Sequence, residues 1–584
     1  MVSSSFSRPA ALAAAGVALV IGHRLAAEEA PIELPKYTVT TERELPPPEQ
    51  WYYARIEGFE VLSSAAESTT RKLIGDFQNF AYALDLVWPG IRPNKHASAK
   101  LIICGQAKKF EVFQPGNLRG TERVTSFHLR SREQAAIVLD QQTKYLTLVN
   151  AEDTAAAPGG DAQTSAAETT AQVFAPDAFQ QLYREYIRFL LSARNVPPPP
   201  WLAEGLSQLL MNLHISATEI SVGQVEDPNA QAPERSGLVD GVAPAAPSQD
   251  RDFNAALGKS RLMPMDELFA TAADSNAARL SRGLWAKQCY AFVHWGLYGD
   301  FGKHQKEFIT FLLRLDREPL SEEMFKACFK QDYREMLQAL RSHIDATRFK
   351  FAGVRADQGQ KIPWPPAPTV REATQAEVGR LTGEVLTLAG HPDDARTTMI
   401  TAYRRGERDP ALLAALGLAE ANGGDSAKAR KFLEAAAAVK VVRPRAYVEL
   451  ARLRLADVRA KPEGANGKLS SKQTASVLEP LFTARSQPPA LPEVYELIAE
   501  TWAASASSPG PAQLAVLDEG VRLYPRNAGL VYADATLQVK AGQFAAAEPL
   551  IRLGLRVTTD ADLRAKYELL KAGRPAPPPA PAKS

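Results

Sequence analysis

Apolar positions follow two different periods along the chain. Residues 58–64 (GFEVLSS) and 100–105 (KLIICG) are short apolar runs bounded by polar residues, which is typical of buried strands. Residues 136–150 carry two such runs around a polar turn, and this pattern predicts a hairpin. Over residues 66–88 the apolar side chains instead recur every three or four positions, which predicts an amphipathic helix.

The helical period dominates the rest of the chain. It predicts a helix over residues 176–193, which the four prolines at 197–200 must end, and a new helix that begins near Trp201. Further helices are expected over residues 262–271, 279–298, 302–314 and 321–343. The order is therefore strands, then a hairpin, then helices.

This order predicts an α+β domain over residues 51–347. Two segments that are poor in large apolar residues, 151–172 and 217–260, are predicted to be surface loops of that domain. Residues 348–372 hold four prolines within a short stretch and are predicted to be a semi-rigid linker.

Residues 373–572 are helical and repetitive. A Gly followed five positions later by an Ala recurs at Gly390/Ala395, Gly424/Ala429, Gly510/Ala515 and Gly542/Ala547, with a looser copy near Ala475. The first two copies are 34 residues apart and the last two are 32 apart. This spacing resembles the tetratricopeptide repeat, in which Gly ends the first helix of a pair and a small residue lets the second helix cross closely.

The resemblance implies an all-α solenoid of five helix pairs and a final helix. Its groove would be a candidate site for a protein or peptide partner. The alternative is a generic helical bundle with alanine-rich packing.

The two ends of the chain have the composition of a leader and a tail. Residues 1–27 contain a basic residue, an apolar run and then small residues, which predicts a cleaved signal peptide; a short N-terminal anchor helix is the alternative. Residues 28–50 and 573–584 are proline-rich and are predicted to be a disordered spacer and a disordered tail. We therefore expect an exported protein, periplasmic or extracellular, with no stable membrane span after signal cleavage.

Charge and cysteine content exclude two classes of function. The chain has 68 basic and 66 acidic residues, and without the leader the numbers are equal, so we expect no nucleic-acid partner. Cys104, Cys289 and Cys328 either form one disulfide and leave one thiol, or are three buried thiols. No CxxC pair exists, so cysteine-based metal or redox chemistry is not expected.

The candidate chemistry lies in two adjacent motifs. Residues 184–188 read REYIR and residues 200–206 read PWLAEGL. Together they resemble the gluzincin metallopeptidases, the thermolysin-like, peptidase-MA-type group, which carry HExxH on one helix and a zinc-binding Glu on the next, often within PxWLxEGL. The element order over residues 51–347 agrees with this resemblance, as does a helix near 285–299 that looks like the one supporting such sites.

The departures from the family motif concern the metal. Arg184 and Arg188 stand where the family has its two histidine ligands, and a guanidinium stays protonated and has no lone pair to offer. Glu185 stands at the position of the general base, and Glu204 at that of the third ligand. The resemblance therefore implies a vestigial site without metal, cofactor or hydrolysis. His214 and His294 have no second histidine at ligand spacing and do not restore a zinc site.

The charges suggest what replaces the metal. Two neutral histidines, one glutamate and Zn²⁺ carry a total charge of +1, and so do Arg184, Arg188 and Glu204. Since residues 184 and 188 share one helical face, we predict that both guanidinium groups bind Glu204 and tie the two helices together. The alternative is that the motifs are two ordinary amphipathic helices with solvated arginines.

The predicted function is that of an exported pseudopeptidase or scaffold. It would bind protein or peptide partners in the cell envelope through the metal-free cleft and the repeat groove. Two alternatives stay open: an active metallopeptidase with a non-standard metal site, and a structural assembly factor in which only the repeats act.

Overall fold

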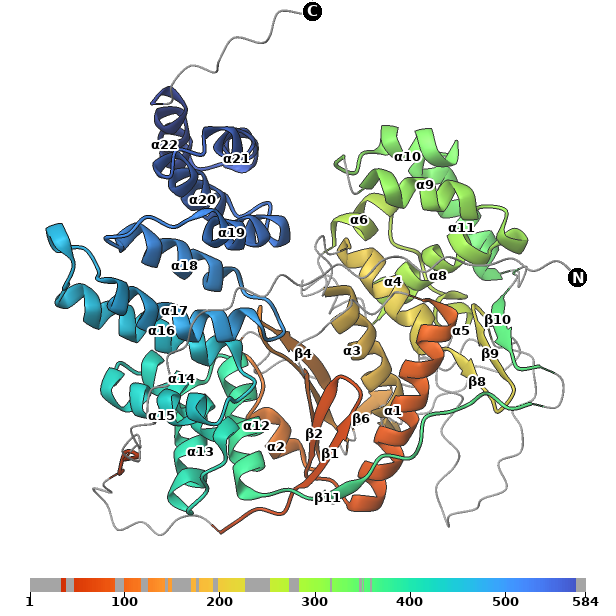
Figure 1. Ribbon diagram of the computed structural model, residues 1–584. Coiled ribbons are helices and arrows are strands. Elements are labelled where there is room, and N and C mark those ends of the chain that lie inside the picture. The colour runs from red at the N-terminus through yellow and green to blue at the C-terminus, as the bar shows by residue number, and fades with distance from the viewer. Residues whose placement is uncertain are drawn as a thin grey trace, which may run out of the picture.

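A computed structural model describes most of the chain (Figure 1). The described residues are 33–37, 47–89, 99–116, 124–141, 145–149, 170–174, 178–192, 198–225, 253–271, 283–315, 318–345, 349, 351–357 and 360–573. The predicted signal peptide and the tail after Gly573 lie outside them.

A mixed six-stranded sheet organises the N-terminal part, with strand order β11-β1-β2-β3-β5-β4. Its strands are β1 (Tyr52–Ile56), β2 (Phe59–Ser63), β3 (Ala99–Cys104), β4 (Ser126–Arg130), β5 (Ala135–Asp140) and β11 (Val370–Glu372). The pairs β2–β3 and β3–β5 are parallel and the others are antiparallel. All six residues of β3 and of β5 are buried, so both faces of the sheet are covered.

The two faces of the sheet belong to two different cores. Leu101 and Ile103 of β3 pack in a core with α1 (Glu67–Val87) and the helices that follow it. Ile102, between them, points the other way and packs in a core with the first repeat helices. The sheet is thus a middle layer, with the repeat array on one side and α1 and α3 on the other (Figure 1).

Buried ion pairs join the sheet to α12, the first repeat helix (Gln375–Leu388). Arg380 of α12 lies 2.7 Å from Glu60 of β2, and Lys100 of β3 lies 3.1 Å from Glu384 of α12. None of these four side chains is more than 11% exposed. The array therefore shares apolar core and charge pairs with the sheet, although a linker was predicted between the two parts.

The predicted hairpin over residues 136–150 does not form, and the end of the predicted loop 151–172 is a strand instead. β6 (Tyr145–Val149) does follow β5, but the two do not form a hairpin; β6 pairs with β7 (Thr170–Phe174) instead. The reason is that β3 and β4 occupy both edges of β5. The predicted loop 151–172 consequently ends in a strand.

Two more segments contain structure that the composition did not predict. The predicted loop 217–260 holds β9 (Glu219–Val222) and α5 (Phe253–Leu257), while residues 226–252 are outside the described part of the chain. The predicted linker contributes β10 (Ala352–Arg355) and β11, and β10 pairs with β9 beside the short β8 (His214–Ile215). These strands have two to four residues, too few to show a period, and β10 and β11 pair with strands that lie far away in the sequence.

The spacer prediction also needs correction. Residues 33–37 are held against the repeats, with Pro35 buried and the hydroxyl of Tyr403 donating a hydrogen bond to its carbonyl oxygen at 2.9 Å. A proline-rich composition therefore did not exclude a docked segment here.

A short helix that was not predicted, α2 (Ala107–Glu111), lies within the sheet region. The later helices follow the predicted order: α3 (Ala178–Ser192), α4 (Pro200–Met211), α6 (Met265–Ala270), α8 (Leu284–Tyr298), α9 (Gln305–Leu315), α10 (Glu322–Phe329) and α11 (Tyr333–Asp345). The single helix predicted over 321–343 is two helices, because Lys330 adopts a left-handed conformation with φ 60° that ends α10.

Residues 373–572 form the predicted helical solenoid. The helix pairs are α12 with α13 (Pro392–Arg404), α14 (Pro410–Asn422) with α15 (Ser426–Ala438), α16 (Pro444–Ala460) with α17 (Ser471–Arg485), α18 (Pro492–Ala504) with α19 (Pro511–Leu523), and α20 (Ala528–Lys540) with α21 (Phe544–Val557), followed by α22 (Ala561–Ala572). Figure 1 shows the pairs stacked from the sheet toward the C-terminus.

The Gly/Ala signal holds in three of the four strict copies. Gly390, Gly424 and Gly542 follow the first helix of their pairs with positive φ, and the alanines five positions later are 0% exposed. In the remaining copy Gly510 precedes α19 instead, and Ala515 is exposed while Leu514 is buried. Ala475 of the looser copy is exposed as well.

Two general findings complete the fold. All three cysteines are buried and none forms a disulfide, which decides between the two alternatives that the sequence left open. Within the described ranges, no helix has both the length and the apolar character needed to cross a bilayer.

Candidate functional site

The two motifs lie on neighbouring helices. α3 buries Tyr186 and Phe189 in the core and leaves Arg184 and Arg188 together on another face. α4 begins with Pro200 at its first turn, where a proline costs no hydrogen bond, and it buries Glu204.

Gly205 allows α4 to approach the supporting helix α8 closely. A Cβ atom at this position would lie 2.6 Å from the carbonyl oxygen of Cys289 and 2.6 Å from Cγ2 of Val293. The glycine of the PWLAEGL motif therefore has a packing role: it lets α4 lie close to α8, while the preceding Glu204 contacts α3.

Both arginines of the first motif bind Glu204. Arg184 Nη2 donates to Glu204 Oε1 at 2.6 Å, and Arg188 Nη2 donates to Glu204 Oε2. Each guanidinium gives this carboxylate one hydrogen bond, so neither makes the two-pronged contact that its planar shape permits. Gln208, one turn further along α4, adds a third donor to Oε1 at 3.0 Å.

The same cluster includes Glu185. Arg188 uses its second nitrogen, Nη1, to donate to Glu185 Oε1 at 3.1 Å, so it bridges the two carboxylates. Glu185 Oε2 lies 3.0 Å from His128 Nδ1 on β4. We call these five residues, His128, Arg184, Glu185, Arg188 and Glu204, the arginine–glutamate cluster.

Burial and charge act in opposite directions on the acids of the cluster. Glu185 and Glu204 are 2% and 1% exposed, and burial alone would raise the pKa of each carboxyl group. For Glu204 the nearby charges of Arg184 and Arg188 outweigh burial and hold the pKa well below its usual range. For Glu185, Arg188 and His128 do the same. Burial would lower the pKa of Arg188, but the two carboxylates raise it.

The residues present do not fit a zinc ion. The positions to which the sequence resemblance assigns nitrogen ligands carry protonated guanidinium groups, and both oxygens of Glu204 already accept hydrogen bonds from them. Across the described ranges, no group of three or more His, Cys, Asp and Glu side chains is placed to hold a metal ion.

The two histidines weighed in the sequence lie elsewhere. His214 is exposed on β8. His294 is buried, and contrary to expectation it has a second histidine beside it: its Nδ1 lies 3.0 Å from His343 Nε2, on α11. Its Nε2 lies 2.8 Å from the carbonyl oxygen of Gly223. The pair is thus engaged in the core, and no contact joins it to the arginine–glutamate cluster among the described residues.

Sequence reasoning missed three members of the site. His128 comes from a strand more than fifty residues earlier, and Gln208 gives no signal of its own. Lys287 lies 3.0 Å from Gln208 Oε1 and so extends the polar chain to α8. It is the one charged side chain in the helix LWAKQCYAFVHWGLY, and a buried lysine in an apolar helix could have been noticed.

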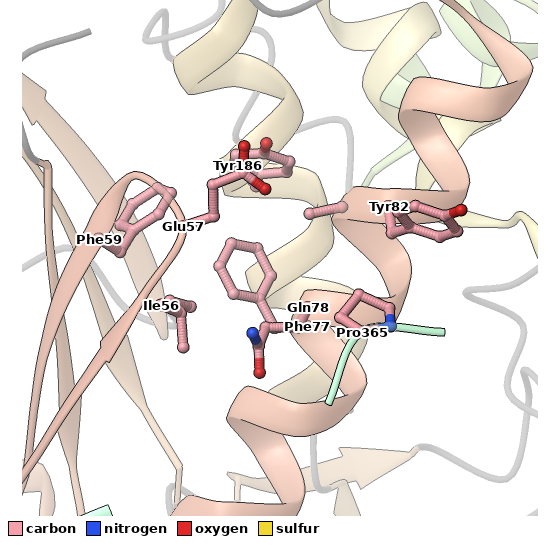
Figure 2. A pocket seen from close by; sticks show the side chains of 9 residues that line it. Ile56, Glu57, Phe59, Phe77, Gln78, Tyr82, Tyr186 and Pro365 are labelled. Carbon is pink, nitrogen blue, oxygen red and sulfur yellow. The ribbon is translucent and has the colours of Figure 1, made fainter. Parts of the chain in front are cut away.

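A small cavity lies beside the motif helix. Ile56, Glu57 and Phe59 line it from the β1–β2 turn, Phe77, Gln78, Ala81 and Tyr82 from α1, Tyr186 from α3, and Pro365 from the segment before β11 (Figure 2). Its volume of about 50 Å³ is far below the several hundred Å³ of a small-molecule site. It is therefore not a substrate cleft.

Comparisons with known proteins bear on the repeats. No family model matches the chain, and no curated protein matches it. Among solved structures, a thermophilic TPR protein of Thermus thermophilus is 19% identical, with 34% of this chain and 99% of that one covered and a TM-score of 0.25. MamA from Desulfovibrio magneticus is 17% identical (32% and 96% covered, TM-score 0.25), and PilF of Pseudomonas aeruginosa is 14% identical (34% and 93% covered, TM-score 0.25).

Proposed function

We propose that this chain is a metal-free relative of the gluzincin peptidases that works as a protein-interaction scaffold outside the cytoplasm. The observation that supports it most is the contact of Arg184 and Arg188 with Glu204. These are the three positions at which the resembling family binds zinc, and here they bind one another.

In this proposal the arginine–glutamate cluster replaces the mechanical role of the metal. Two cations and two carboxylates balance in charge and connect α3 to α4, as a zinc ion would through its ligands. Without a metal there is no metal-bound water for Glu185 to activate, so the proposal gives it no general-base role. It serves as a partner for Arg188 and His128 instead.

The binding role rests on the array. Repeat arrays present long, continuous surfaces because each helix pair contacts only its neighbours. Here the array also shares a core with the sheet, so the two halves would present a partner with one rigid body. Export is part of the proposal through the composition of residues 1–27 alone.

Zinc analysis of the full-length protein tests the metal-free part. After dialysis we expect far less than one zinc per chain, and no peptidase activity. Retention of one zinc per chain would overturn the proposal in favour of a peptidase with a non-standard site.

A double variant tests the same assignment by restoring zinc binding. Arg184→His with Arg188→His recreates a pair of neutral ligands one turn apart beside Glu204, and we expect it to retain zinc. The matched control is Arg552→His with Arg556→His in a Glu548→Ala background, two exposed arginines at the same spacing on α21 with the acid one turn before them removed, and it should retain none. If the first variant folds and binds no more zinc than the control, the assignment of these positions as a former zinc site is wrong.

A further inference from the structure

A short N-terminal segment is docked on the repeat array. Residues 33–37, Glu-Leu-Pro-Lys-Tyr, lie beside α13 and α15, at the red end of the colour bar in Figure 1. Leu34 and Tyr37 pack against the core that the array shares with the sheet, and Pro35 is buried. The side chains of Glu33 and Lys36 are 79% and 89% exposed, so the segment presents one face to the array.

Tyr37 reaches a buried acid. Its hydroxyl donates to Glu420 Oε1 at 2.6 Å, and Glu420 is 1% exposed near the end of α14. Arg396 of α13 holds this carboxylate from the other side, with Nε at 2.9 Å from Oε1 and Nη2 at 3.1 Å from Oε2.

Aromatic rings enclose the tyrosine side chain. The Tyr37 ring is stacked on Phe432 with centroids 6.2 Å apart and meets the edge of Tyr403 at 5.8 Å. Lys428 Nζ lies 5.4 Å from the centre of the same ring. Contacts of this kind favour an aromatic side chain, and Glu420 favours one that carries a hydroxyl group.

The backbone of the segment is recognised separately. The Tyr403 hydroxyl donates to the carbonyl oxygen of Pro35 at 2.9 Å. Tyr403 therefore contacts both the proline and the tyrosine, which fixes their spacing along an extended segment. We call the surface formed by Arg396, Tyr403, Glu420, Lys428 and Phe432 the tyrosine slot.

We propose that the tyrosine slot is a peptide-recognition site and that residues 33–37 fill it as a tethered ligand. The recognised chemistry is an extended segment with Leu-Pro-x-Tyr, in which the leucine, the proline and the tyrosine hydroxyl face the array. Because the ligand is on the same chain, its effective concentration is high, so other peptides reach the slot only when it is displaced. This inference deepens the proposed scaffold function and rests on it only for the repeat array.

A labelled peptide of residues 31–41 (PIELPKYTVTT) measures the proposal on the full chain. Fluorescence anisotropy would compare wild type with Tyr37→Ala, whose own segment lacks the anchoring side chain. We expect the peptide to bind Tyr37→Ala at least tenfold more tightly than wild type, and the same peptide with Ala in place of Tyr37 to bind neither. Tyr37→Ala combined with Phe432→Ala should lose the binding again.

Trypsin cleavage after Lys36 provides a second readout that needs no variant. Docking should protect this bond in wild type, and an excess of unlabelled peptide should speed its cleavage by displacing the segment. Equal peptide affinity of wild type and Tyr37→Ala, or no binding to a folded Tyr37→Ala, would overturn the proposal. So would a cleavage rate that the peptide does not change.

Two outcomes distinguish the tethered segment from binding by a second copy of the chain, and the tyrosine slot from the metal-free proposal. Dimers that form in wild type and vanish in Tyr37→Ala would mean that the slot takes the segment of a second copy, which would overturn the tethered arrangement. A failed peptide test with no retained zinc would reject the slot and leave the metal-free proposal standing, so the two can fail independently.

Discussion

Arg184 and Glu204 are joined by a hydrogen bond of 2.6 Å between two different helices, α3 and α4. Glu204 is almost completely buried there and is surrounded by three donors from Arg184, Arg188 and Gln208. A buried carboxylate is stable only with its donors in place, and the arginines in turn need its negative charge.

Glu204→Ala should destabilise the protein by about 3–5 kcal/mol, because Arg184 loses its carboxylate partner and Arg188 keeps only Glu185, although each arginine side chain is only 24% exposed. The depressed pKa of Glu204 means that its contribution is present above its ordinary pKa of 4.5 and is lost only as the pH falls through the lower folded value. Urea unfolding at pH 7 measures the loss.

Glu500→Ala is the matched control for this change. Glu500 also forms an ion pair between helices, 2.6 Å from Arg459, but both side chains are nearly half exposed. Its loss should cost no more than about 1 kcal/mol. Similar losses for the two variants would show that the arginine–glutamate cluster does not hold α3 and α4 together.

Gly205→Ala should also destabilise the chain, by about 1–3 kcal/mol, because the added methyl group would overlap Cys289 and Val293 of α8. Gly75→Ala is its control: it too lies inside a helix, but the nearest atom to its new Cβ is 3.8 Å away. There the better helix former should be neutral or stabilising by up to about 1 kcal/mol. Thermal unfolding of both variants checks the contrast, and a Gly205→Ala protein as stable as wild type contradicts it.

Acid should weaken the core around His294 and His343. Burial lowers the pKa of His294 to about 4 and that of His343 to about 3, from an ordinary value of 6.5. Between pH 6.5 and 4 the unfolded chain therefore binds protons that the folded chain does not, so this contribution to stability is complete above pH 6.5 and falls as the pH decreases.

The variant His343→Gln isolates this effect. Its loss of stability between pH 7 and pH 5 should be smaller than that of wild type, whereas His214→Gln, an exposed histidine, should leave the wild-type loss unchanged. Denaturant unfolding at the two pH values gives both numbers. An identical pH dependence in all three proteins would exclude a role for the histidine pair.

The contribution of Asp534, in the array, to stability should change with pH in the opposite direction. Its side chain is 0% exposed, and burial, followed by the charge of Asp518, raises its pKa from 3.8 to about 7. The folded chain thus holds a proton that the unfolded chain releases, so this contribution is complete below pH 3.8 and is lost as the pH rises through 7.

Asp534→Asn should remove that loss and stabilise the protein at pH 8 relative to wild type. Each unit of pKa shift corresponds to about 1.4 kcal/mol, so the gain is large enough to measure by unfolding at pH 5 and pH 8. Asp562→Asn, an exposed position on α22, is the control and should change nothing. A gain for Asp534→Asn that is equal at both pH values would indicate a packing effect instead.

Local pattern determined a large part of this protein. A Gly/Ala recurrence every 32 to 34 residues predicted the helix pairs of the array, because each pair repeats the same local turn and close helix crossing. Residue identity likewise determined that Arg184 and Arg188 cannot bind zinc, since a guanidinium has no lone pair in any fold. The motif alone also marked Glu204 as a candidate partner of the two arginines.

Tertiary structure decided which surfaces meet. The sequence of β5 and β6 does not show that β6 pairs with β7, nor does β3 show that its two faces enter two different cores. The contacts of His128 with Glu185, of His343 with His294 and of Tyr37 with Glu420 join residues up to 383 positions apart. Such pairings leave no periodic trace, because a side chain's local sequence records that it is buried and not which distant residue buries it.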